Sequence, residues 1–163
     1  MAVYINPRYH KGPPLERSTQ RAKDGQTWQA GQFGRRTDSG VVTCKANASS
    51  IQFCFAAAQP TATSSSDVLI DDIVADNTEL IMGVTNAGAD TKALSAYIGN
   101  AYGLGVADSI CTVSTGNDST EVLQVRNILP NLEGFDNDTS DVPGFVTVIV
   151  PSAVRAAEGN GVT

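Results

Sequence analysis

The sequence contains one histidine, three cysteines and many carboxylates, and these are the side chains that could carry a reaction. The histidine, His10, lies in a proline-containing segment at the N-terminus. A general base must be held within hydrogen-bonding distance of its partner, and a segment of this composition does not ensure that. Ser-His-Asp and Cys-His mechanisms need the same histidine in a defined pocket, so neither is expected.

The carboxylates do not form a recognisable catalytic or metal-binding motif. Asp71 and Asp72 are adjacent, so in a strand they point to opposite faces, and an acid–base pair would need a bulge. The segment DNDTSD (136–141) begins like a calcium loop, with Asp136 and Asp138 supplying oxygens, but Asp141 stands where such a loop needs glycine. We therefore expect a solvated loop, with no catalytic residue, metal ligand or cofactor.

The cysteines and the chain composition indicate a small intracellular domain. Cys44, Cys54 and Cys111 form no CxxC pair and are expected to be small buried side chains. No apolar run approaches the ~20 residues of a membrane span, and residues 1–14 lack the apolar centre of a secretion signal. Synthesis in the cytoplasm, with no membrane contact, is the expectation.

Charge is divided unequally along the 163 residues. Residues 1–45 hold eight Lys/Arg and three acids, whereas residues 46–163 hold three Lys/Arg and fourteen acids. Residues 1–24 contain three prolines and no regular period, which predicts an extended arm that orders on a partner. One alternative is a frayed terminus without a binding role. Binding of the arm to nucleic acid is a weaker alternative, because the acidic body would repel phosphate. The side chains predicted to bind the partner are Tyr4, Arg8, Tyr9, Lys11, Arg17, Arg21, Lys23 and Trp28. Trp28 lies where the arm meets the body, and it also fits a buried position in the core or at an interface.

The sequence pattern of the remaining chain predicts short strands. Charged residues are 17% of the sequence, against a usual ~25%, and turn residues separate short β-branched runs. A hairpin turning at 37–40 is predicted, as are strands in 51–58, 78–84, 108–114, 120–129 and 144–150. Residues 67–74 fit either a helix or a strand, and their β-branched residues favour the strand, while 93–105 is the best helix candidate, at one to two turns. The prediction is a mainly β fold, a small antiparallel β-barrel or β-sandwich with an extended N-terminal arm and at most one or two short helices. Its parts are the arm (1–24), the body (25–155) and a flexible C-terminal tail (156–163).

The order of several motifs resembles the capsid decoration (cement) proteins of tailed bacteriophages. The resembling pieces are QTWQAGQFGRRTDSGVVTCKANASSIQFCFAAA, VLIDDIVADNTELIMGV, AYIGNAYGLGVADSICTVS and VLQVRNIL followed by PGFVTVIVP, within residues 25–152. The resemblance implies a small β-barrel on the outside of an icosahedral capsid, where it braces capsomer junctions. It also implies that the partners are the major capsid protein and copies of the chain itself, with a trimer favoured and a dimer possible.

Two other functions are compatible with the same residues. One is a different structural subunit of the virion, in the tail or an adaptor. The other, less favoured, is a carbohydrate-binding or hydrolytic module that uses surface acids such as Asp71, Asp72, Asp136 and Asp138. A non-enzymatic, structural virion protein is the expectation that the sequence favours.

Overall fold

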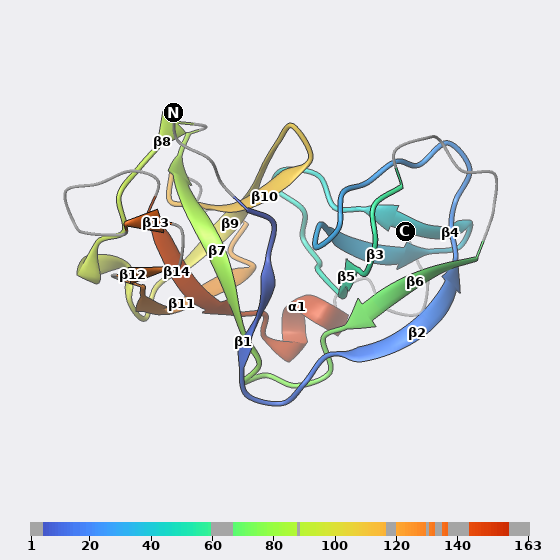
Figure 1. Cartoon of the computed structure of the whole chain (residues 1–163), viewed down its shortest axis with the longest axis horizontal. Helices are drawn as coiled ribbons and strands as arrows, with labels where there is room; N and C mark the ends of the chain where they lie inside the picture. Colours follow the sequence, from blue (N-terminus) through green and yellow to red (C-terminus); the bar gives the residue numbers. More distant parts are fainter. Residues whose placement is uncertain are drawn as a thin grey trace.

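The computed structural model describes residues 5–59, 67–87, 89–116, 120–129, 131–132, 135–136 and 144–156. The fold is mainly β, which confirms the predicted class. Its strands form a closed barrel and a second, five-stranded sheet that lie side by side (Figure 1).

Five strands close the barrel. Their order is β7 (Glu79–Asn86), β10 (Ile110–Ser114), β9 (Ala101–Ala107), β11 (Leu123–Ile128) and β14 (Phe145–Ile149), and β14 pairs back onto β7. All of these pairs are antiparallel except β7–β10. Two further strands extend β7, namely β1 (Arg8–Lys11) beside the end of β10 and β8 (Ala89–Asp90). A separate two-stranded ribbon consists of β12 (Asn131–Leu132) and β13 (Phe135–Asp136).

The second sheet curls until its two edge strands touch at one point. Its order is β2 (Glu16–Arg21), β6 (Asp67–Asp72), β5 (Phe53–Phe55), β3 (Phe33–Thr37) and β4 (Gly40–Thr43). Ala22, just after β2, forms an isolated parallel bridge with Val41 of β4. The amide of Lys23 donates to the Val41 carbonyl over 3.1 Å. The sheet is therefore closed at the end of β2 but not along its length.

One hydrophobic core joins the barrel to the second sheet. Phe33, Ile51 and Cys54 of the second-sheet region belong to the same buried cluster as barrel residues such as Leu104 and Val146. A smaller cluster fills the curl of the second sheet itself, and consists of Ala22, Trp28, Val41, Phe53, Phe55 and Ile70. Because apolar contacts run without a break from one β structure to the other, we expect the described chain to behave as one rigid unit.

A short helix near the end of the described chain ties the two β structures together. Helix α1 (Ser152–Ala156) follows β14, and its Arg155 reaches the β6–β7 connection. The guanidinium donates to the Asp76 carboxylate over 2.9 Å and to the Ala75 carbonyl over 3.4 Å. Gln52 returns a hydrogen bond to the Arg155 carbonyl over 3.1 Å. This helix was not predicted.

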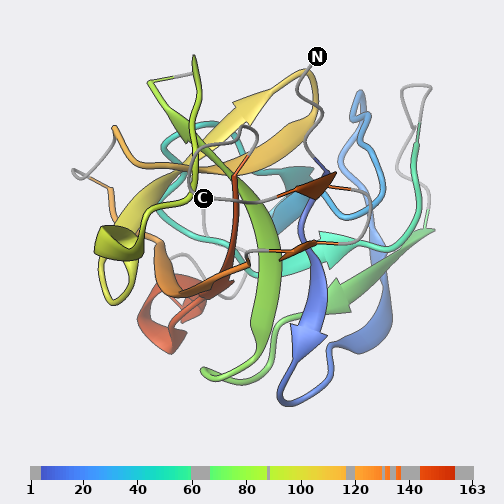
Figure 2. The ribbon, with the colours of Figure 1, turned by 60° about the vertical axis from the view of Figure 1, so that its left-hand side comes forward.

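The predicted separation of an arm from a body at residue 24 is wrong for the described residues. β1 pairs with β7 of the barrel, and β2 pairs along six residues with β6 of the second sheet (Figures 1 and 2). Between them, the Thr78 hydroxyl donates to the Pro13 carbonyl over 2.6 Å. β1 is exposed throughout, so its sequence carries no apolar alternation, and main-chain pairing rather than side-chain burial holds it.

Most local predictions hold, with one exception. The turn at 37–40 joins β3 to β4 as a hairpin, and residues 67–72 form a strand as favoured. The exception is residues 93–105, where a helix of one to two turns was expected: they form a single 3₁₀ turn, η1 (Ser95–Tyr97), followed by strand β9. Gly99 has φ +87° directly after this turn, which ends the helical path. The predictions for residues 137–141 of the calcium-like segment and for the tail after residue 156 lie outside the described residues.

Candidate functional site

The residues predicted to bind a partner are divided between the two β structures. Arg8, Tyr9 and Lys11 lie on β1 at the barrel, whereas Arg17 and Arg21 lie on β2 of the second sheet. Lys23 follows β2 directly. Tyr4 lies outside the described residues. The structure therefore does not gather these side chains on one arm.

Two of these cations are already paired within the chain. Lys11 Nζ lies 3.7 Å from a Glu79 carboxylate oxygen, and Arg17 Nε lies 2.9 Å from Asp71 Oδ1. The hydrogen bond from Arg17 to Asp71, with the carboxylate charge, raises the pKa of the Arg17 guanidinium above its usual value. Exposed pairs of this kind hold side chains in place more than they add stability. Lys11 and Arg17 brace strand pairs and are poor candidates for contacts with a partner.

Trp28 is a core residue, and its predicted role in partner binding is wrong. Its side chain is 3% exposed and stacks on Phe55 at a centroid distance of 4.2 Å. The indole N–H donates to the Ala57 carbonyl over 2.7 Å. The alternative interpretation, that Trp28 is a buried residue of the core, is confirmed.

The adjacent carboxylates of β6 hold the second sheet together. Asp72 accepts from Arg36 Nη2 over 2.8 Å at each carboxylate oxygen, and Ser18 donates to it over 3.3 Å. Arg36 also lies over the Phe53 ring, 5.5 Å from its centroid. Asp71 pairs with Arg17 instead, as expected for neighbours on opposite faces of a strand. Each carboxylate has its own cation, so the two do not converge on a common reacting atom.

The cysteines lie in the core, as predicted, and His10 lies on the exposed strand β1. Burial raises the pKa of the Cys54 thiol, and it raises the pKa of the Cys111 thiol to about 12. Both thiols therefore stay protonated and unreactive near neutral pH. Among the described residues, no group of three or more His, Cys, Asp or Glu side chains could hold a metal ion.

The β3–β4 hairpin is the feature that shapes the surface of the second sheet. At its turn the Thr37 hydroxyl donates to the Gly40 carbonyl over 2.6 Å and accepts from the Ser39 amide over 3.2 Å. Gly40 has φ +124°, and a Cβ there would lie 2.6 Å from the Arg21 carbonyl oxygen. Only glycine fits both the positive φ and this close approach, so the DSG sequence lets the hairpin lie against the end of β2.

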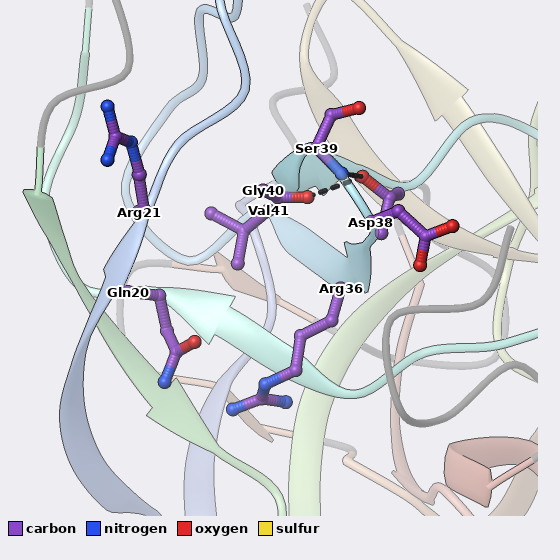
Figure 3. A pocket seen from close by; sticks show the side chains of 8 residues that line it. Gln20, Arg21, Arg36, Asp38, Ser39, Gly40 and Val41 are labelled. Atoms are coloured by element: carbon purple, nitrogen blue, oxygen red, sulfur yellow. Dashed lines mark hydrogen bonds between the residues drawn. The ribbon is translucent and has the colours of Figure 1, made fainter.

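A groove lies on each side of this hairpin. The first, about 450 Å³, separates β2 from the hairpin, and Figure 3 shows Gln20 and Arg21 facing Ser39, Gly40 and Val41 across it. The second, about 650 Å³, lies on the other side of the turn, and its lining includes Lys23, Gln26, Arg35, Thr43, Lys45 and Asn47. Thr37, Asp38 and Ser39 line both grooves. We call the two grooves and the hairpin between them the hairpin surface.

The hairpin surface is strongly cationic for a chain of net charge −6. The described residues of its lining include five cations and one carboxylate, namely Arg21, Lys23, Arg35, Arg36, Lys45 and Asp38. Within the described part of the chain, no ion pair engages Arg21, Lys23 or Lys45. Arg21 and Lys23 were among the predicted binding residues. Arg35, Arg36 and Lys45 were not, although their charges lie close to the predicted turn in the sequence.

The fold and this surface define a class of protein: a rigid, mainly β chain that presents a basic surface on an acidic molecule. Comparison with protein-family models, with curated proteins and with solved structures found no match to the chain. In the residues that the structure describes, no helix is both long and apolar enough to span a bilayer.

Proposed function

We propose that this chain is a structural protein of a tailed-bacteriophage virion, a decoration (cement) protein that binds the outside of the icosahedral capsid and stabilises the junctions between capsomers. The motifs within residues 25–152 support this proposal by resemblance. The partners it implies are the major capsid protein and further copies of the chain. In this proposal the protein is not an enzyme, takes no cofactor and acts mechanically.

The observation that carries the proposal is the continuous core that unites the barrel and the second sheet. A brace between neighbouring capsomers must transmit force without deforming, and closely packed interiors have low compressibility. The N-terminal strands contribute to that rigidity, because β1 extends the barrel and β2 forms an edge of the second sheet. In place of the flexible anchor expected from the sequence, the structure supports attachment through a rigid surface.

The carboxylates closest to a catalytic arrangement also support a structural role. Asp71 and Asp72 each hold an arginine of a neighbouring strand, and Asp76 holds Arg155. Each of these carboxylates therefore joins segments that are distant in the sequence, and this role stabilises the fold.

The test is to find the protein in purified virions and to measure what its loss does. Particles made with and without the chain are compared by electron microscopy and by the temperature at which they release DNA. We expect density of the size of this chain on the outer capsid face, and earlier DNA release from particles that lack it. Density confined to the tail would assign it to another structural subunit, and its absence from virions would overturn the proposal.

A further inference from the structure

We propose that the hairpin surface is the docking site for an acidic protein surface, with Arg21, Lys23 and Lys45 as the side chains that contact the partner's carboxylates. The inference deepens the proposed function by naming the contacting surface. It rests on that function for the identity of the partner, while the chemistry of the surface can be tested on the isolated protein.

The first argument is that these three cations have no internal task. Within the described residues, Lys11, Arg17, Arg36 and Arg155 all form ion pairs that join separate segments. Arg21, Lys23 and Lys45 are exposed and form none. Arg21 lines the first groove, and Lys23 and Lys45 line the second, although up to 24 positions separate them in the sequence. Three solvated cations on one surface favour an anionic partner.

The second argument is that the surface has a fixed shape. Main-chain pairing of β3 with β4 over four residue pairs holds the hairpin, and the bridge from Ala22 to Val41 fixes it against β2. The Thr37 hydroxyl donates to the Gly40 carbonyl and accepts from the Ser39 amide, so the turn itself is braced. Cations placed on a preorganised surface lose less entropy on binding than cations on a flexible arm.

The third argument concerns the class of partner. A surface for single-stranded nucleic acid combines cations with exposed aromatic rings on which bases stack. Among the described residues, neither groove is lined by an aromatic side chain, and Trp28 is buried inside the curl of the sheet. Asp38 stands between the grooves, where it would repel phosphate but could accept a hydrogen bond from a basic or hydroxyl side chain of a protein. These features favour a protein surface rich in carboxylates.

The test uses poly-L-glutamate as the probe and two triple variants of the full chain. The hairpin variant is R21Q/K23Q/K45Q, and the control is R8Q/K92Q/R126Q, which removes three exposed cations elsewhere. Both variants change the net charge from −6 to −9, so the general charge effect is the same. Because all six side chains are exposed, both variants are expected to fold, which circular dichroism and thermal melting check.

We expect immobilised poly-L-glutamate to bind the unchanged chain in a salt-dependent manner. The hairpin variant should bind it about ten-fold more weakly, and the control about two-fold or less. Amide shifts on titration should centre on residues 35–45. Equal losses in the two variants, or no binding by the unchanged chain, would overturn the inference.

Two further outcomes would replace the occupant that we propose. Duplex DNA of equal charge bound more tightly than poly-L-glutamate, with the same dependence on the hairpin cations, would indicate nucleic acid. Self-association that the hairpin variant abolishes, seen by light scattering, would indicate a second copy of the chain. If the chain binds poly-L-glutamate through these cations but is absent from virions, the inference about the hairpin surface stands and only the proposed function is contradicted.

Discussion

The barrel and the second sheet each consist of five paired strands, yet they close in different ways. In the barrel, β14 pairs with β7 along four residues, so the ring of main-chain hydrogen bonds is complete. In the second sheet, β2 and β4 meet at the single bridge from Ala22 to Val41. The complete ring leaves no free edge among its strands, whereas the incomplete one leaves space for grooves beside a hairpin. Closure favours stability, and incomplete closure leaves room for a binding surface.

The sharpest test of this difference is truncation, because the first 24 residues contribute one strand to each β structure. Deletion of residues 1–12 removes β1, which lies outside the ring of five strands, and the two hydrogen bonds of Asn6 to Cys111 and Ser109. We expect this variant to fold, with unfolding free energy lower by about 2–4 kcal/mol. Deletion of residues 1–24 also removes β2 and Ala22, which opens the second sheet, and we expect no cooperative unfolding.

Circular dichroism and thermal melting measure both truncated proteins. A stable, cooperatively melting chain that lacks residues 1–24 would show that β2 is dispensable and would restore the idea of a separate arm. Failure of the shorter deletion to fold would show instead that the barrel depends on β1.

The shared core predicts that the two β structures unfold together. Phe55 lies inside the second sheet and Leu104 inside the barrel, and both are buried. Phe55→Ala should lower the free energy of unfolding by about 3–5 kcal/mol, and Leu104→Ala by about 2–5 kcal/mol, through lost apolar contacts and the cavities left behind. Both variants should unfold in one transition in urea.

The spectroscopic probes for this experiment differ between the two regions. Trp28 fluorescence reports on the second sheet, and far-ultraviolet circular dichroism reports on all strands. Coincident curves support one unit. If the fluorescence of Phe55→Ala changes at a lower urea concentration than its circular dichroism, the two β structures unfold separately.

The buried thiols give the next prediction, because Cys54 and Cys111 lie in the core that joins the regions. Burial raises the pKa of Cys111 from 9.0 to about 12 and raises that of Cys54 as well. In the unfolded chain these thiols lose their protons first, so rising pH favours unfolding. The stability they contribute is present below about pH 9 and falls above it, by about 1.4 kcal/mol per pH unit for each thiol.

Urea unfolding under reducing conditions from pH 8 to pH 10.5 measures this slope. The variant C54A/C111A should be less stable at pH 8, but its alkaline slope should be flatter, because it lacks the two thiols whose loss of protons favours unfolding. Equal slopes would show that these thiols reach solvent in the folded state.

The part of the fold that the sequence predicts is the part carried by local pattern. Apolar runs and turn residues identify β3, β4, β6 and β14, because alternation, β-branching and a DSG turn act within a few residues. The pairing of β1 with β7 leaves no such trace, since all four residues of β1 are exposed and are held mainly by main-chain hydrogen bonds. An exposed strand and an unstructured arm have the same composition.

The candidate site, too, has a part that the sequence predicts and a part that depends on strand pairing. The excess of cations before residue 46 is visible in the sequence and includes all three side chains of the proposed contact. What the sequence does not show is which cations are engaged internally, because the partners of Arg17 and Arg36 come from β6, more than 30 residues away. Strand pairing determines which cations form ion pairs within the chain. The sequence therefore predicts an excess of positive charge but not the surface on which that charge lies.

The smallest expected effect concerns the polar contacts that brace the incompletely closed sheet. The side chains of Asp72 and Arg36 are 20% and 29% exposed; Asp72 also accepts a hydrogen bond from Ser18, and Arg36 lies over the Phe53 ring. The side chain of Arg17, the partner of Asp71, is 60% exposed. Asp72→Asn should therefore lower the free energy of unfolding by about 1–2 kcal/mol, because it leaves the half-buried Arg36 without its counter-charge. Asp71→Asn should have a smaller effect, since water solvates the released Arg17. Urea unfolding of the two variants at low and high salt compares them, and the opposite order of effects would show that solvent reaches the interior of the second sheet. In that case the hairpin surface would not have the fixed shape on which its proposed binding depends.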